Sequence, residues 1–412
     1  MSIGDDNDGA MNFKSNFNQL WRIFIQSSIA LTFSIGGMFS GGIISKFKHL
    51  FIPFPWILAL YPSILSLRGD ISGVLSGKLG TMLHTGDIKP QFTGNTHDFH
   101  ALIKAIFILT FIDSFAMGVL TFIINLSIGI AQSRDLPYFI ITPLASCILA
   151  TMLSLPITLM TAFTSFRRGL DPDIIVYPVV AILSDVIVAI CYATIITLIL
   201  SFKEHSIMAI SILALLLFVT LLISSKSDFN LTTFSSTLKE ASPIVLLTSL
   251  AGVLNGVFLA NFKYTLEERP EVLVVYPVIL NALGGLGSIL GSITTTRLAL
   301  GFIQPKYSSF KYLNLDIIGI SSSSIILHTI YGFIAYIFCL LANFSVNLYS
   351  LTILCIMTNL IGMILIFILS FTISIKAYNR GWDPDNMVIP IVSSISDFLG
   401  TVILVSLARL IL

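Results

Sequence analysis

Long apolar stretches follow one another along almost the whole chain, separated by short polar segments. A helix needs about 20 apolar residues to cross the ~30 Å hydrocarbon core of a bilayer. We therefore predict an all-α polytopic membrane protein with about eleven transmembrane helices. A transmembrane β-barrel would show alternating segments of about ten residues instead. The predicted spans are 21–45, 51–82, 101–130, 136–165, 174–200, 206–223, 241–261, 272–300, 315–342, 347–375 and 386–411.

Composition agrees with this pattern. Of the 412 residues, 55% are hydrophobic and only 10% are charged, whereas soluble domains carry roughly 25% charged residues. This rules out a soluble enzyme, so we expect no catalytic activity. A formal net charge of +1 provides no basic surface for nucleic acid, so we expect no nucleic-acid partner. The apolar stretches instead indicate that a lipid bilayer surrounds the protein. The four cysteines stand apart in apolar runs and are predicted to be buried packing residues.

The chain contains an internal repeat. Arg168–Asp173 has the sequence RGLDPD, and Arg380–Asp385 has RGWDPD. Tyr61-Pro62 also recurs as Tyr276-Pro277, at nearly the same offset, and a weaker pair aligns Gln26 with Glu240. Several single residues recur in register with the first motif, namely Pro178 and Pro390, Ser184 and Ser396, and Asp185 and Asp397.

The repeat predicts the domain organisation. A short cytoplasmic N-terminus, 1–20, precedes a first five-helix repeat, 21–200. A linking helix within 201–234 leads to the second five-helix repeat, 235–412. Each repeat has five spans, an odd number, so two repeats joined directly would have opposite orientations in the membrane. The additional linking helix gives both repeats the same orientation, and we expect a pseudo-two-fold axis along the membrane normal.

Lysine and arginine set the predicted orientation. With the N-terminus in the cytoplasm, fourteen of these residues lie on the inner side and seven on the outer side. Because cytoplasmic loops carry the excess of positive charge, we expect a cytoplasmic N-terminus and an extracytoplasmic C-terminus.

The last predicted helix of each repeat carries the strongest candidate residues. Asp185 lies twelve residues after Asp173, which is about 18 Å along a helix and hence near the middle of the bilayer. Asp397 occupies the same depth in the second repeat. An acidic side chain at this depth is costly and usually functional. The structural alternative is a carboxylate tied to a nearby serine or arginine.

Residues around these two aspartates extend the predicted site. The Asp-Pro-Asp motifs suit helix starts and would also attract cations to the mouth of a pore. Their carboxylates belong to Asp171, Asp173, Asp383 and Asp385. The candidates for lining a pore are Pro178, Pro390, Ser184, Ser396, Gly69 and Gly284, although tight helix packing would equally explain the glycines. Asp113, for which we find no counterpart in the second repeat, is expected to be a hydrogen-bonded group or to line a vestibule.

Paired carboxylates favour a hard divalent cation, Mg²⁺ first, with Mn²⁺ or Ca²⁺ as alternatives. Mg²⁺ dehydrates reluctantly, so a few carboxylates that act through its water shell are sufficient.

The Asp-Pro-Asp, Pro and Ser-Asp pattern, present twice, resembles the MgtE family of magnesium channels and transporters. The resemblance covers about 20–412, and the duplicated layout is closest to the solute-carrier branch. It implies Mg²⁺ transport through a pore between the two repeats, with Asp185 and Asp397 as the central ligands. It also implies that one chain completes its pore as a monomer. The second helix of the family often carries a Gly-Asn pair, whereas this chain has Gly69-Asp70 and Gly284-Gly285 at these places. The ion selectivity of this chain can therefore differ from that of the family's prototypes.

We therefore expect a multi-pass protein of the cell membrane that carries a divalent cation. Two alternatives remain open from the sequence. The first is a Na⁺- or H⁺-coupled Mg²⁺ exchanger, and the second is a membrane scaffold or receptor that transports nothing.

Overall fold

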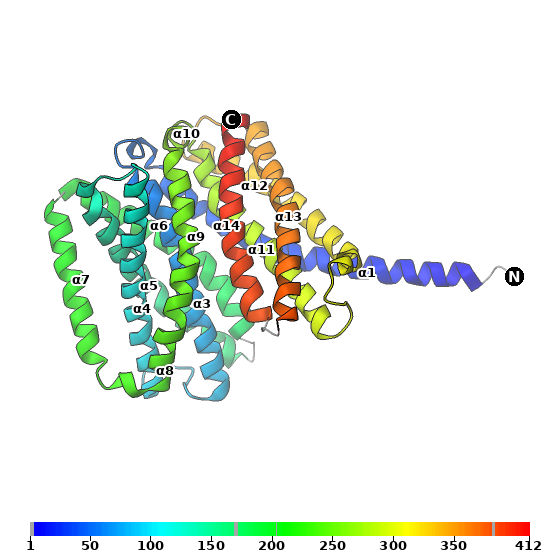
Figure 1. Ribbon diagram of the computed structural model, residues 1–412, viewed down its shortest axis with the longest axis horizontal. Helices are drawn as coiled ribbons and strands as arrows, with labels where there is room; N and C mark the ends of the chain where they lie inside the picture. The colour runs from blue at the N-terminus through cyan, green and yellow to red at the C-terminus, as the bar shows by residue number, and fades with distance from the viewer. Residues whose placement is uncertain (1–3, 169–171, 203, 381–383) are drawn as a thin grey trace. The chain divides into compact units, whose positions relative to one another are not determined.

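The computed structural model describes residues 4–168, 172–202, 204–380 and 384–412, and this part of the chain is helical (Figure 1). It divides into two compact units. Unit 1 comprises residues 1–38 and 274–412, and unit 2 comprises residues 39–273. Apolar side chains fill the interior of each unit, while many large apolar residues remain exposed, as expected for surfaces that face lipid.

Unit 2 consists mainly of helices from the first half of the chain. Its long helices are α3 (Trp56–Thr85), α4 (His97–Ser127), α5 (Leu136–Arg167), α6 (Pro172–Phe202), α7 (Glu204–Ser224) and α9 (Ser242–Asn261). Its short elements are η2 (Lys48–Leu50), η3 (Ser133–Asp135), η4 (Asp228–Asn230), α8 (Thr232–Ser236), a π-helical turn η5 (Thr237–Ala241) and α10 (Lys263–Glu268).

Unit 1 contains α1 (Gly4–Thr32) and the helices of the second half. These are α11 (Glu271–Ala299), α12 (Asn314–Leu341), α13 (Leu348–Asn379) and α14 (Pro384–Ile411), with the short helices η1 (Phe33–Gly36) and η6 (Tyr307–Leu313). The helices α2 (Gly37–Ser45) and α11 cross the boundary between the units.

Nine of the predicted spans coincide with helices of the described residues that are long and apolar enough to cross a membrane. The other two are also helical. However, α3 carries Arg68, Asp70 and Lys78, and the apolar part of α9 is the shorter segment Val245–Asn261. The multi-pass prediction is confirmed, whereas the count of eleven stays a prediction.

The first helix of each sequence repeat belongs to the unit that contains most of the other repeat. Helix α1 packs against α12, and α9, which corresponds to α1 in the second repeat, packs against α3. In unit 1, Tyr331 donates a hydrogen bond to the Leu31 carbonyl (2.6 Å). Ser28 and Ser323 share a hydrogen bond of 2.9 Å. Each repeat therefore has its first helix in the unit that holds the other repeat's remaining helices.

Glycines also bring the first span of each repeat close to the second helix of the other repeat, with Gly37 at the start of α2 and Gly252 on α9. A Cβ atom at Gly37 would lie 3.1 Å from Pro277 Cβ. One at Gly252, which lies at the offset of the Tyr-Pro pair from Gly37, would lie 3.1 Å from the Pro62 carbonyl oxygen. Glycine allows two helix backbones to approach each other in a membrane. The contact within unit 1 is thus repeated within unit 2 by corresponding residues.

Helix α7 is the predicted linking helix. It is apolar, and only 6% of its most hydrophobic window is buried. Leu213, Leu215 and Leu216 are each more than half exposed. We interpret this helix as facing lipid, because large apolar side chains that remain exposed are stable in a hydrocarbon environment.

Candidate functional site

Asp185 lies on α6 of unit 2 beside a contact with α3. The preceding residue, Ser184, is 1% exposed, and its hydroxyl shares a hydrogen bond of 3.1 Å with Ser72 on α3. Asp185 itself is partly exposed and lies close enough to Tyr61 for the two groups to interact electrostatically. The helix contact therefore fixes the backbone at Asp185, a residue that is neither fully buried nor fully exposed.

Tyrosine side chains hold α3 and α6 together near this point. The rings of Tyr61 and Tyr192 stack with centroids 6.3 Å apart. Tyr61 shares a hydrogen bond of 2.8 Å with Ser40, and Tyr192 donates one of 2.7 Å to the Ile57 carbonyl. Both phenols are thus satisfied although they are fully buried.

Asp397 lies at the corresponding place on α14 of unit 1. It is also partly exposed. One turn later, Thr401 donates a hydrogen bond of 2.7 Å to the Asp397 carbonyl and shares one of 3.0 Å with Tyr276 on α11. Tyr276 corresponds to Tyr61, so a buried tyrosine of the second helix lies near the aspartate in both units.

The serines that precede the aspartates have different surroundings. Ser396 is fully buried, and its Oγ has no hydrogen-bond partner among the described residues. The residue that corresponds to Ser72 is Gly287, and a Cβ atom added there would lie 3.6 Å from Ser396 Oγ. Loss of the partner hydroxyl leaves a buried polar group unsatisfied.

The glycines on the second helices have different surroundings in the two units. Nothing lies within 4 Å of a Cβ built at Gly69 or Gly77 on α3. On α11, a Cβ at Gly284 would be in ordinary contact with Ser393 Oγ at 3.5 Å, whereas one at Gly287 would overlap the side chain of Val392. Space along α3 is therefore open, and α11 uses Gly287 for tight packing.

The described parts of α6 and α14 begin at the prolines of the two Asp-Pro-Asp motifs, Pro172 and Pro384. The other residues of this prediction lie outside the described residues, entirely or in their side chains, namely Asp171, Asp383, Asp173, Asp385, Pro178 and Pro390. Their proposed roles stay predictions.

Two further carboxylates lie where α3, α4 and α9 pack together, Asp113 fully buried and Asp70 partly exposed. Asp113 is fully buried and accepts a hydrogen bond of 2.6 Å from Ser242 through Oδ1, whereas its Oδ2 has no partner among the described residues. Asp70 accepts a hydrogen bond of 2.6 Å from Thr248 and interacts electrostatically with Asp113. Asp113 is thus the hydrogen-bonded group that the sequence suggested. Its partner belongs to a distant segment and could not be identified from sequence.

Arg68 is a buried cation in α3. The side chain is 2% exposed, and Nη2 donates a hydrogen bond to Ser154 on α5. Its Nε has no hydrogen-bond partner in the described part of the chain. Arg68 therefore points toward α5, where the hydroxyl of Ser154 meets part of its hydrogen-bonding capacity.

The donor set limits the kind of metal site. The described residues contain no group of three or more His, Cys, Asp or Glu side chains placed to hold a metal ion. The oxygen donors described above are the carboxylates of Asp70, Asp113, Asp185 and Asp397 together with neighbouring hydroxyl and carbonyl groups. Such a set suits Mg²⁺ rather than zinc or copper.

Comparison with known proteins now adds to this geometry. The family model MgtE, described as "Divalent cation transporter", matches residues 61–195 and 276–407. Each matched segment begins at the tyrosine of the Tyr-Pro pair and includes the mid-helix aspartate. The two matches therefore follow the internal repeat.

Two curated relatives match over most of the chain. Solute carrier family 41 member 3 of Rattus norvegicus is 21% identical over 395 residues, which cover 90% of this chain and 83% of the relative. Its counterpart from Mus musculus is 20% identical over 409 residues, which cover 93% and 82%. No solved structure matches this chain.

Proposed function

This chain belongs to the MgtE family of divalent cation transporters, and on that premise we propose that it carries Mg²⁺ across the cell membrane along a path served by Asp185 and Asp397. The observation that carries the proposal is the double family match, in which each segment contains one of these aspartates on its last helix. Neither residue is fully buried, which is consistent with contact to an ion or its water shell.

Two features that both aspartates share support a common role. Each follows a buried serine on a helix that packs against the second helix of the same repeat. The sequence repeat suggests that both carboxylates act on one ion between parallel repeats. A single chain would then complete the pore as a monomer. The four Asp-Pro-Asp carboxylates would raise the cation concentration at the mouth of this path.

The membrane potential supplies the driving force in this proposal. It contributes ~2.3 kcal/mol per elementary charge per 100 mV, and about twice that for a divalent ion. Mg²⁺ retains much of its water shell, so the carboxylates stabilise a charge that is only partly desolvated. No step requires a covalent intermediate.

Flux measurements on reconstituted protein test the proposal. In proteoliposomes under an inward-negative potential, we expect Mg²⁺ uptake by the wild type. Asp185→Asn and Asp397→Asn should each lower uptake at least about tenfold, which corresponds to about 1.4 kcal/mol of lost ion stabilisation. Asp87→Asn is the control, because Asp87 lies in an exposed loop and accepts a hydrogen bond from Thr85. Absence of wild-type flux, or unchanged flux in the double variant, would refute the proposal and favour a scaffold or receptor.

One observation favours a second candidate, a Na⁺- or H⁺-coupled Mg²⁺ exchanger. Asp70 and Asp113 are hydrogen-bonded to hydroxyls of α9, and buried carboxylates of this kind carry protons or sodium in coupled transporters. An imposed Na⁺ or pH gradient at zero voltage would drive Mg²⁺ flux only in an exchanger. If it does, Asp113→Asn should abolish that coupling while voltage-driven uptake continues.

A further inference from the structure

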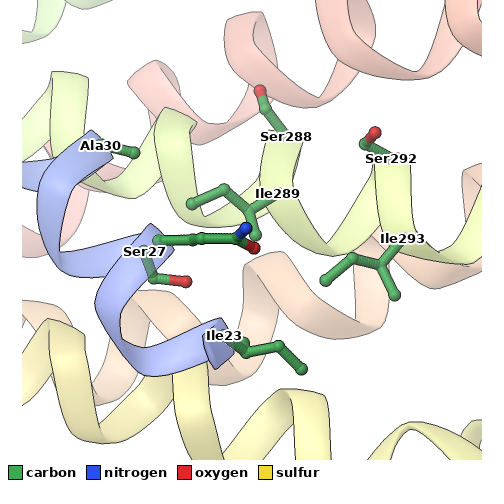
Figure 2. Close-up of a pocket in the computed structure, with 8 residues that line it drawn as sticks. Ile23, Ser27, Ala30, Ser288, Ile289, Ser292 and Ile293 are labelled. Atoms are coloured by element: carbon green, nitrogen blue, oxygen red, sulfur yellow. The ribbon is translucent and has the colours of Figure 1, made fainter. Parts of the chain in front are cut away.

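A cleft with a mainly apolar wall and four polar side chains lies between α1 and α11 in unit 1. Its volume is about 380 Å³. Figure 2 shows Ser27 and Ala30 on α1, facing the stretch of α11 that carries Ile289 and Ile293. The lining residues are Ile23, Gln26, Ser27, Ala30, Ser288, Ile289, Ser292 and Ile293.

Unit 2 has a cleft at corresponding positions. On α3 it is lined by Gly73, Val74, Gly77 and Lys78, which correspond to Ser288, Ile289, Ser292 and Ile293 in the register of the Tyr-Pro pair. On the other side, Thr237 and Ala241 correspond to Ile23 and Ser27 when Gln26 is aligned with Glu240. A cleft that recurs within each unit at matched residues belongs to the architecture of the repeat.

The cleft of unit 1 contains a buried polar group without a partner. Ser27 is 1% exposed, and its Oγ has no hydrogen-bond partner among the described residues. An unsatisfied buried hydroxyl costs free energy, which a ligand in the cleft would recover. Across the cleft, the Ser288 hydroxyl donates to the Gly284 carbonyl (2.9 Å), so its lone pairs remain available as acceptors.

These groups suit a cation that keeps its water shell. The cleft offers only neutral oxygens, namely those of Gln26, Ser27, Ser288 and Ser292. Six waters occupy roughly 180 Å³ at the density of the liquid, so a hexahydrated ion fits within about 380 Å³. Because Mg²⁺ dehydrates reluctantly, hydroxyl and amide oxygens would accept hydrogen bonds from its bound waters.

The position of the cleft links it to Asp397. Ser288 and Ser292 lie one and two turns after Gly284 on α11, and a Cβ at Gly284 would contact Ser393. Ser393 precedes Asp397 by one turn of α14. The cleft therefore lies in the same unit as Asp397, about 6–12 Å along α11 from this contact.

We propose that the α1–α11 cleft is an outer-sphere binding site for a hydrated divalent cation that supplies the path containing Asp397. This inference rests on the proposed transport function. Only the cleft of unit 1 would bind the cation, because the unit 2 cleft has Lys78 at the position that Ile293 occupies in unit 1. The ammonium group of Lys78, 3.4 Å from Ser236 Oγ, repels a cation there.

A binding experiment tests the site without relying on transport. Hexaamminecobalt(III) has an inert ligand shell, so it can bind only through that complete shell and never through direct metal coordination. Calorimetric titration of the purified full-length protein should reveal a saturable site that is weakened about two- to tenfold by Gln26→Leu with Ser27→Ala. Ile293→Lys, which copies the other cleft, should abolish it, and the size-matched Ile293→Met should leave it intact.

Transport measurements then separate this site from the aspartates. The cleft variants should raise the half-saturating Mg²⁺ concentration by the same factor and leave the maximal rate unchanged, whereas Asp397→Asn should lower the maximal rate. Hexaamminecobalt binding that is unchanged in both cleft variants, at unchanged thermal stability, would overturn the cleft proposal whether or not flux is observed. Absence of wild-type flux with cleft binding retained would instead overturn the transport function alone.

Discussion

At the scale of single residues, matched positions of the two repeats have diverged in ways that make opposite predictions for substitution. Ser72 hydrogen-bonds to Ser184, whereas the corresponding Gly287 packs against Val392 and Ile366. A Cβ at Gly287 would overlap the first of these side chains and lie 2.8 Å from the second. At this position of the repeat, a hydrogen bond joins the two helices in unit 2, whereas close apolar packing joins them in unit 1.

Gly287→Ala should destabilise the protein, because overpacking a filled interior typically costs about 1–3 kcal/mol. Ser72→Ala should cost less, since a hydrogen bond between membrane helices averages about 0.6 kcal/mol. Thermal unfolding in detergent, monitored by size-exclusion chromatography, would compare the melting temperatures of the two variants. A larger loss for Ser72→Ala would contradict the packing at Gly287.

Asp228, in the turn after α7, makes a pH-dependent contribution to stability. Burial alone would raise the pKa of Asp228, but the hydrogen bond and charge of Lys104, whose Nζ lies 2.8 Å from Oδ2, outweigh it and hold the pKa below its ordinary value. His97 adds a weaker contact at 3.5 Å. The ionised form is thus favoured by folding, so its contribution is present at neutral pH and is lost as pH falls below about 4.

Asp228→Asn should therefore lower the melting temperature at pH 7 and flatten the acid side of the stability profile. The check is a series of melting curves between pH 3 and pH 7, with Asp135→Asn as the control, because Asp135 caps an exposed turn. An acid limb as steep in the variant as in the wild type would show that other carboxylates dominate it.

At the scale of elements, close helix crossings hold each unit together. On α9, a Cβ at Gly256 would overlap the Ala59 carbonyl oxygen of α3, whereas nothing lies within 4 Å of a Cβ at Gly77. The backbone at Ala59 has no flexible end that could move aside. The crossing of α3 and α9 therefore depends on glycine at 256.

Gly256→Ala should push α9 away from α3 and lower the melting temperature by several degrees, since a loss of 1 kcal/mol shifts the melting of a domain by about 2–8 °C. Gly77→Ala should have no such effect, because alanine has the higher helix propensity and fits the open space. Equal melting temperatures for the two variants would argue against the close crossing.

The sequence predicts the spans better than their pairing. Hydropathy locates the helices because each must bury its backbone in lipid. It does not reveal which repeat supplies the partner of each first span, because Gly37 and Gly252 meet equivalent prolines, Pro277 and Pro62. Likewise, Asp185 and Asp397 stand out by depth and repetition, whereas the bond between Asp113 and Ser242 joins distant segments that no local pattern connects.

At the scale of the whole molecule, the predicted topology has a cytoplasmic N-terminus and an extracytoplasmic C-terminus. The four native cysteines are buried, so single introduced cysteines can be labelled against a low background. Thr93, between α3 and α4, and Ser133, between α4 and α5, are exposed. The predicted orientation places Thr93 inside the cell and Ser133 outside.

A membrane-impermeant maleimide applied to intact cells should therefore label Ser133→Cys and spare Thr93→Cys until the membrane is opened. The opposite result would invert the topology, because the two loops flank a single helix. Labelling of both positions in intact cells would mean that α4 does not separate the two compartments.

The exchange of first helices has a consequence for biosynthesis. Helix α1 ends at Thr32, and its partner α12 begins only at Asn314, so α1 leaves the ribosome long before the helix that covers it has been made. At about 5–20 residues per second, this delay is roughly 15–60 s. During that interval the nascent chain holds a membrane-inserted helix whose docking face is occupied by lipid or by a chaperone. Unit 1, which contains the first helix to be synthesised, is thus completed last, after the C-terminal helices have been synthesised.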